Sequence, residues 1–305
     1  MSTRPRPEAA LPVPESGGPV RVLRKLRGAD LARAAEVARA ALTHDEAEAE
    51  ALVERLAAPP ANRRWAALVT GGGLAMASMS TADPAVGHVD LLAVHPGHQG
   101  RGQGRELLRA AEGWLRGEGA RRVRLAGNPP CYAWPGVDVR YTPAACLAES
   151  LGYERDHIAW NMTADLDTDL DVRADVERLA GLGIEVRAAG DDRRRVAEFV
   201  REHWNDSWAW ETTNAAGLHH AERDGRVLAF AAWGARPSWF GPMGTAPEAR
   251  GTGLGRVLLR LCLADMRAAG QRTAQIGWVG PLRFYSRAVG ARAERVFWQY
   301  GRELA

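Results

Sequence analysis

The chain has 305 residues and a mass of 33.1 kDa, which excludes one small domain and fits two compact domains of about 150 residues each. Hydrophobic residues make up 46% and charged residues 25% of the sequence, so a disordered or collagen-like chain is also excluded. The 40 cationic and 37 anionic residues are interspersed, and this balance argues against a nucleic-acid-binding protein although the pI is near 9.0.

The first 19 residues combine five prolines with Ser, Gly and Ala, and they lack the apolar core of a signal peptide. We therefore expect a disordered tail over 1–19. No apolar run reaches the roughly 18 residues that a membrane span requires. The three cysteines, Cys131, Cys146 and Cys262, have neither disulfide-framework nor zinc-ligand spacing. These features predict a cytoplasmic protein without a metal and without membrane or nucleic-acid partners.

An internal repeat organises the rest of the chain. An offset of 151 positions places Pro96 on Pro247, and it continues through a glycine-rich segment and the residues that follow it. The aligned pairs include Gln99 with Arg250, Gly100 with Gly251, Gly102 with Gly253, Gly104 with Gly255, Leu107 with Leu258 and Leu108 with Leu259. The repeat predicts two related domains, 20–170 and 171–305, joined by a connection over 163–183.

The expected elements follow the same order in both halves. In the first half we expect strands at 20–26, 65–69, 74–79, 89–94 and 123–126, with a helix after the glycines that ends near Gly119. In the second half we expect strands at 184–188, 227–233, 240–245 and 274–278, with a helix that ends near Gly270. Helical segments follow the first strand of each half. The fold class is α/β, and each strand–helix–strand unit should have a right-handed crossover.

The glycine segments, QGRGQG at 99–104 and RGTGLG at 250–255, each follow a strand and open a helix. Closely spaced backbone N–H groups at the positive end of a helix bind phosphate groups well, and glycine leaves room for the phosphate oxygens. A tight turn that only caps the helix is the alternative. Neither segment is a Walker loop or a dinucleotide-binding fingerprint.

The pattern Gln/Arg-x-x-Gly-x-Gly after a strand, with a proline three residues earlier, resembles motif A of the GCN5-related N-acetyltransferases (GNAT). The resemblance covers about residues 20–303. It implies two GNAT-like domains in tandem, each a mixed, mostly antiparallel twisted sheet flanked by helices, with acetyl-CoA as co-substrate. The implied coenzyme-binding residues are Gln99, Gly100, Gly102 and Gly104 in the first half and Met243, Thr245, Arg250, Gly251, Thr252, Gly253, Gly255 and Arg256 in the second.

The two halves differ at the position of the family's catalytic phenol. Tyr285 matches the tyrosine that commonly protonates the departing thiolate, whereas the alignment of the final glycines puts Leu147 at the equivalent position. The first half also carries an insertion that includes 129–142. The resemblance therefore implies a catalytic second half and an accessory first half. Val279-Gly280-Pro281 departs from the family's usual asparagine, and a purely structural role for Tyr285 stays open.

The segment 202–214, EHWNDSWAWETTN, lies where GNAT folds usually build the acceptor pocket. Its residues predict an aromatic wall of Trp204, Trp208 and Trp210, with Asp206 or Glu211 as the ammonium-binding group or general base. In the alternative reading, the tryptophans are core anchors and the acids are solvated.

His203, His219 and His220 are secondary candidates for the base. Adjacent histidines on opposite faces of a strand favour a surface position. Cys131 lacks an evident histidine partner for nucleophilic catalysis.

These features predict direct attack of a neutral primary amine on acetyl-CoA without a covalent intermediate. The expected acceptor is a small molecule such as an amino sugar or an aminoglycoside-like compound, and the expected state is a monomer or homodimer. Two alternatives remain open from the sequence. One is a non-catalytic acetyl-CoA-binding sensor, and the other is an N-acetyltransferase that acts on proteins.

Overall fold

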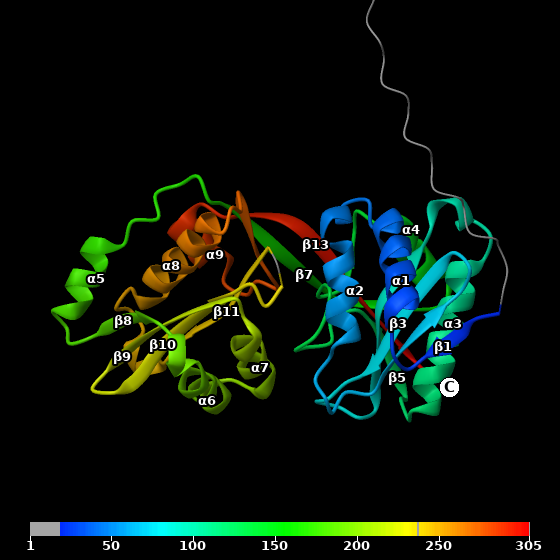
Figure 1. Cartoon of the computed structure of the whole chain (residues 1–305), viewed down its shortest axis with the longest axis horizontal. Helices are drawn as coiled ribbons and strands as arrows, with labels where there is room; N and C mark the ends of the chain where they lie inside the picture. The colour runs from blue at the N-terminus through cyan, green and yellow to red at the C-terminus, as the bar shows by residue number, and fades with distance from the viewer. Residues whose placement is uncertain (1–18, 237, 305) are drawn as a thin grey trace, which may run out of the picture. The chain divides into compact units, whose positions relative to one another are not determined.

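The computed structural model describes residues 19–236 and 238–304, so the predicted tail lies, except for Pro19, outside the described residues. These residues form two compact units (Figure 1). Unit 1 comprises residues 19–57 and 63–123 with residue 304, and unit 2 comprises 58–62 and the remaining described residues of 124–303. Within the described chain, no helix is long and apolar enough to cross a membrane.

In unit 1, four antiparallel strands lie in the order β1 (Arg21–Leu23), β2 (Trp65–Val69), β3 (Gly73–Met79) and β4 (Val86–Val94). The unit also contains α1 (Gly28–Ala41), η1 (Glu46–Glu48), α2 (Ala49–Ala57), η2 (Pro96–His98) and α3 (Gln103–Gly117). The apolar face of α3 packs on the sheet where glycines leave space, because Leu107 lies over Gly73 and Leu115 lies over Gly87. Strand β5 (Arg122–Leu125) crosses the division between the units.

In unit 2, the strand order is β13-β7-β12-β11-β10-β9-β8, and β6 pairs with β13. Only β11 and β12 pair in parallel; the other pairings within this unit are antiparallel. The strand bounds are β6 (Val137–Asp138), β7 (Glu154–Asp165), β8 (Glu185–Ala188), β9 (Gly217–Arg223), β10 (Arg226–Trp233), β11 (Trp239–Thr245), β12 (Thr273–Ile276) and β13 (Arg292–Glu303). A mixed, mostly antiparallel sheet flanked by helices was expected, and it is confirmed.

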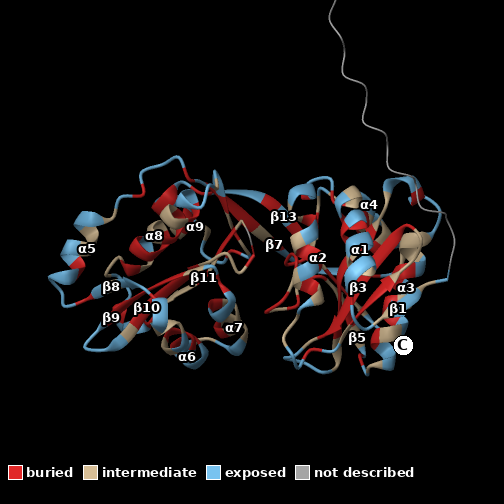
Figure 2. Ribbon diagram, in the orientation of Figure 1, coloured by how far each residue is buried: buried red, intermediate tan, exposed pale blue. Residues whose placement is uncertain are grey.

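Helices cover both faces of this sheet (Figure 1). The helices of this unit are α4 (Thr142–Ser150), α5 (Arg173–Ala180), α6 (Arg193–His203), α7 (Asp206–Asn214), α8 (Leu254–Ala268) and α9 (Leu282–Val289), with the short η3 (Gly190–Asp192) and η4 (Pro247–Ala249). Helices α8 and α9 pack on one face of the sheet, and α6 and α7 pack on the other. Neighbouring strand residues point to opposite faces. Accordingly, Ala229 and Ala231 join the core under α8 and α9, whereas Phe230 joins the core under α6 and α7. The strands β9 and β10 are therefore mostly buried, and every residue of β11 is buried or half-buried (Figure 2).

The compact units and the sequence repeat divide the chain at different places. Strand β7 belongs to the predicted first domain, 20–170, yet it pairs with β12 and β13 in unit 2. The division into units follows spatial packing, whereas the expected domains follow the repeat in the sequence. The connection contains α5, which ends before Gly181 as expected.

Candidate functional site

The second-half glycine loop runs from η4 into α8. Gly251 and Gly253 have φ angles of +80° and +89°, a region that L side chains rarely adopt. Within the described chain, the backbone N–H groups of residues 251–255 have no hydrogen-bond acceptor. Successive unpaired donors at the positive end of a 15-residue helix favour the binding of an anion.

The first-half loop has the same backbone geometry. Gly100 and Gly102 have φ angles of +73° and +84°, and the N–H groups of residues 100–104 also have no acceptor in the described chain. The Gln99 side chain donates from Nε2 to the Val94 carbonyl oxygen at 2.9 Å, which fixes the loop to the end of β4. Both loops therefore have the geometry that phosphate binding requires.

Strands β11 and β12 separate shortly after they pair. Their parallel register includes only Trp239 with Gln275 and Phe240 with Ile276; β12 then ends, while β11 continues to Thr245. The Ala246 N–H group donates to the Leu228 carbonyl oxygen at 2.8 Å. Backbone groups of an antiparallel strand alternate in direction, so those of Met243 and Thr245 point away from β10. They face the edge that β12 leaves open.

Tyr285 lies on α9 with 8% of its surface exposed. Its ring packs edge-to-face against Phe240 at 6.3 Å and Phe284 at 5.0 Å between centroids. Burial raises the pKa of Tyr285 to about 12, so the phenol keeps its proton at neutral pH. In the first half, Leu147 is a half-buried residue of α4 that offers no proton.

Two tryptophans of 202–214 pack on each other and on Phe230 of β10. Trp204 and Trp208 stack with 6.0 Å between their ring centroids, and both contact Phe230. Both are partly buried and extend the core under α6 and α7, which agrees with the core-anchor reading of these residues. Trp204 also covers Gly244, which lies between Met243 and Thr245 on β11. Trp210 is half-buried on α7.

The two acids of this segment have different surroundings. Asp206 begins α7 with 88% of its side chain exposed, and it accepts a hydrogen bond from Arg201 Nε at 2.8 Å. Glu211 is half-buried further along the same helix. The Asn205 side chain caps this helix, since its Oδ1 accepts the Trp208 N–H at 2.8 Å. The roles of Asp206 and Glu211 stay predictions.

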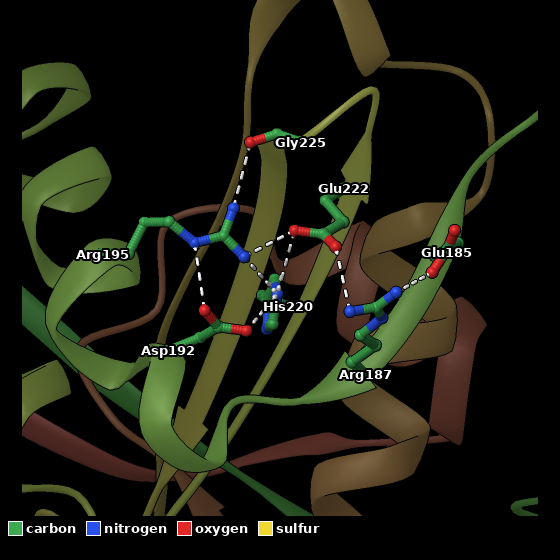
Figure 3. Close-up of polar contacts among 7 residues, drawn as sticks. All are labelled: Glu185, Arg187, Asp192, Arg195, His220, Glu222 and Gly225. Atoms are coloured by element: carbon green, nitrogen blue, oxygen red, sulfur yellow. Dashed lines mark hydrogen bonds and ion pairs between the residues drawn. The ribbon is translucent and has the colours of Figure 1, made fainter.

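The expected surface position of His219 and His220 is wrong, although they do point to opposite faces. His219 Nε2 lies 2.7 Å from Asp265 Oδ2 of α8. His220 is fully buried on the α6 side, within 3.4 Å of Arg195 and 3.6 Å of Glu222 (Figure 3). Both are buried because helices cover both faces of β9. Desolvation lowers the pKa of His220, which favours its neutral form.

The network in Figure 3 is an ion-paired support for strands β8 and β9. Arg195 Nη2 donates to Glu222 at 2.5 Å, and Arg187 lies 3.4 Å from the other oxygen of that carboxylate. Arg187 also pairs with Glu185, and Arg195 with Asp192. His220 is enclosed by these ion pairs, which indicates a structural role for its side chain. His203, in contrast, is exposed at the end of α6.

The cysteines and possible metal ligands complete the set of candidates. Cys131 is buried, and burial raises the pKa of the Cys262 thiol well above its usual value. Among the described residues, no group of three or more His, Cys, Asp or Glu side chains could hold a metal ion.

Two notable residues were not singled out from the sequence. Asp90 is a buried carboxyl on β4 that accepts a hydrogen bond from Ser78 Oγ at 2.6 Å. Burial raises its pKa to about 7. An acid inside the apolar run VGHVDLLAV is the sequence signal for it. Arg178 of α5 contacts the second glycine loop, and no local pattern in the sequence indicates this contact.

Comparison with known proteins matches the acetyltransferase (GNAT) family twice, over residues 31–134 and 187–290. Two curated relatives are both named mycothiol acetyltransferase. The protein from Thermomonospora curvata is 31% identical over 212 residues, which cover 64% of this chain and 66%, just under two thirds, of that relative. The protein from Thermobispora bispora is also 31% identical, over 69% of this chain and 73% of that relative.

A solved structure described as a tandem GNAT protein from the clavulanic acid biosynthesis pathway has a similar fold. It superposes with a TM-score of 0.66 at 18% sequence identity. The superposition covers 94% of this chain and 99% of that one. At this identity, the likeness concerns the fold.

Proposed function

Because the chain belongs to the acetyltransferase (GNAT) family and carries two copies of its domain, we propose that it transfers the acetyl group of acetyl-CoA to the primary amine of a small molecule. The enzyme class follows from the family and from relatives that are themselves named acetyltransferases. The acceptor, the coenzyme contacts and the catalytic residues are part of the proposal.

The second glycine loop binds the coenzyme pyrophosphate in this proposal. The N–H groups of residues 251–255 donate to phosphate oxygens, and the positive φ angles of Gly251 and Gly253 point these donors outward. Arg250, Thr252, Gly255 and Arg256 complete the loop. A hydrogen bond to a charged acceptor contributes about 1.5–3 kcal/mol, so a few of them give substantial affinity.

The reaction takes place at the open edge of β11. The neutral amine attacks the thioester carbonyl, so a C–N bond forms and the carbonyl oxygen becomes an oxyanion. The backbone N–H of Met243 or Thr245 stabilises this oxyanion. When the C–S bond breaks, the Tyr285 phenol protonates the thiolate. Glu211 or Asp206 accepts the amine proton, directly or through water.

A ring-bodied amine such as an amino sugar suits the aromatic and acidic character of 202–214. Trp204 lies against Gly244 of β11, Trp208 stacks on Trp204, and the two carboxylates lie on α7. The name mycothiol acetyltransferase, carried by the relatives, favours a small-molecule acceptor over a protein. In the first half we propose coenzyme binding without catalysis, since the loop is present and Leu147 replaces the phenol.

The observation that carries this proposal is the presence, in one half, of a donor-lined glycine loop and a buried, protonated tyrosine. A free-thiol release assay with acetyl-CoA tests it across deacetylated mycothiol, amino sugars, aminoglycosides, polyamines and peptides. Release that requires a small amine supports the proposal. Release with peptides alone would identify a protein acetyltransferase. Coenzyme binding without release for any acceptor would identify a sensor.

A further inference from the structure

The connector helix α5 is tied to the second glycine loop by charged side chains. Arg178 Nη2 donates to the Thr252 carbonyl oxygen at 2.9 Å, and it lies 3.4 Å from Asp175 Oδ1. Arg256, in the first turn of α8, donates from Nη2 to both oxygens of Asp175 at 2.9 Å. These contacts place one cationic side chain of α5 beside the loop.

The Arg178 guanidinium lies where a loop-bound anion would be within reach. Its Nη2 is 3.1 Å from the position that a Cβ on Gly253 would occupy. All the side-chain hydrogen bonds and ion pairs that Arg178 makes within the described chain use Nη2, so Nε and Nη1 remain available as donors. The side chain is 46% exposed. A planar guanidinium with two available donor groups matches phosphate oxygens well.

The charges around the loop point to Arg178 in particular. Arg256 is already neutralised by a two-oxygen contact with Asp175. Arg178 meets the same carboxylate only at 3.4 Å and directs its other bond to an uncharged carbonyl. Its charge is therefore less compensated, and it lies beside five backbone donors that also attract an anion.

We infer that Arg178 is a coenzyme-binding residue that donates from the connector helix to the pyrophosphate held by the second loop. This inference rests on the proposed function. It also distinguishes the two loops, because no atom of the described chain lies within 4 Å of a Cβ on Gly100 or Gly102 outside the adjacent residues. The second loop should therefore bind acetyl-CoA more tightly than the first.

The test measures acetyl-CoA affinity by calorimetry in a Gly102→Glu background, which removes the contribution of the first loop. Loss of one charge-assisted hydrogen bond corresponds to about 1.5–3 kcal/mol. Arg178→Ala should thus raise Kd by roughly 10- to 100-fold, and Arg178→Lys by less. Arg173→Ala is the matched control, since Arg173 is an exposed arginine of α5 that pairs with Asp171. Its Kd should equal that of the background.

Two further measurements separate direct binding from bracing of the loop. Asp175→Asn removes a negative charge beside the loop. It also weakens the contacts that residue 175 makes with Arg178 and Arg256. Bracing alone predicts weaker coenzyme binding in that variant, whereas direct binding by Arg178 predicts unchanged or tighter binding. The Arg178→Ala defect should persist with acetyl-dephospho-CoA, which lacks the 3′-phosphate, and disappear with acetyl-pantetheine, which lacks the pyrophosphate.

The outcomes are distinct. If the protein without any substitution binds no acetyl-CoA, the proposed function fails. If it binds acetyl-CoA and both Arg178 variants bind equally well, the inference about Arg178 is overturned while the proposed function stands. Weaker binding of acetyl-CoA with unchanged binding of acetyl-dephospho-CoA would also overturn it, because Arg178 would then contact the 3′-phosphate.

Discussion

The indole of Trp204 lies so close to Gly244 that a Cβ added to this glycine would lie 2.3 Å from Trp204 Cζ2. The tryptophan comes from the end of α6, and the glycine lies between Met243 and Thr245 on β11. One contact therefore joins the predicted acceptor wall to the strand that is proposed to hold the oxyanion.

Gly244→Ala should disturb this contact. The added methyl group displaces the indole, and overpacking of this kind costs about 1–3 kcal/mol. We expect a lower unfolding free energy in urea and a higher KM for the amine, with a smaller change for acetyl-CoA. Gly113→Ala on α3 is the control, because no described atom outside the adjacent residues and the backbone of the same helix lies within 4 Å of the new Cβ. Equal KM values for the amine in the two variants would show that Trp204 does not contribute to the acceptor site.

Both glycine loops should bind acetyl-CoA, because both present unpaired N–H groups at a helix start. Gly253→Glu and Gly102→Glu each place a carboxylate where a phosphate would lie, and each should abolish binding at its own loop through steric exclusion and charge repulsion. Calorimetry should show two sites in the unsubstituted protein and one in each variant. If Gly102→Glu leaves the stoichiometry unchanged, the first loop is structural.

Tyr285→Phe should lower kcat by roughly 10²-fold or more, which is the usual loss when a general acid is removed. The ring still packs against Phe240, so acetyl-CoA affinity and thermal stability should change little. Leu147→Ala, at the equivalent first-half position, should change stability alone. A Tyr285→Phe enzyme with full activity would assign protonation of the thiolate to water.

Removal of a charge and removal of an aromatic ring from the proposed acceptor site should change the kinetics in different ways. Glu211→Gln keeps the side-chain shape but removes the charge, so KM for the amine should rise, and kcat should also fall if Glu211 is the base. Trp208→Ala should weaken acceptor binding by about 1–3 kcal/mol, if stacking on this ring resembles that of nucleic-acid bases. Wild-type kinetics in both variants would leave 202–214 as core and helix surface only.

Asp90 should make stability depend on pH. Its pKa is about 7 when folded and near 3.8 when exposed, so the folded state binds more protons between these values. The unfolding free energy should therefore fall as pH rises through this range, by on the order of 4 kcal/mol, and then level off. Asp90→Asn keeps an oxygen for the Ser78 hydroxyl and should remove this fall.

Urea denaturation between pH 4 and 8 measures the effect. Glu54→Gln on the exposed face of α2 controls for the loss of one acidic residue. Parallel curves for the Asp90→Asn variant and the unsubstituted protein would show that Asp90 titrates normally in the folded state.

The sequence by itself determined the features that depend on neighbouring residues. Positive φ angles at Gly100, Gly102, Gly251 and Gly253 follow from glycine's lack of a Cβ, and the start of each long helix follows from the loop before it. The contrast between Tyr285 and Leu147 was equally readable, because the repeat aligns the two positions. The expected strands and the two long helices followed from apolar periodicity and turn residues, whereas β7 and β13 were not among the expected strands.

Tertiary structure decided the features that depend on residues far apart in the chain. His219 and His220 point to opposite faces as alternation requires, but only the packing of α8 and α6 on those faces buries them. Arg178 donates a hydrogen bond to Thr252, 74 positions further along the chain. Strand β7 lies in the first repeat of the sequence but pairs with β12 and β13 of the second. Local sequence fixes backbone conformation, whereas burial and long-range contacts depend on which surfaces the whole chain brings together.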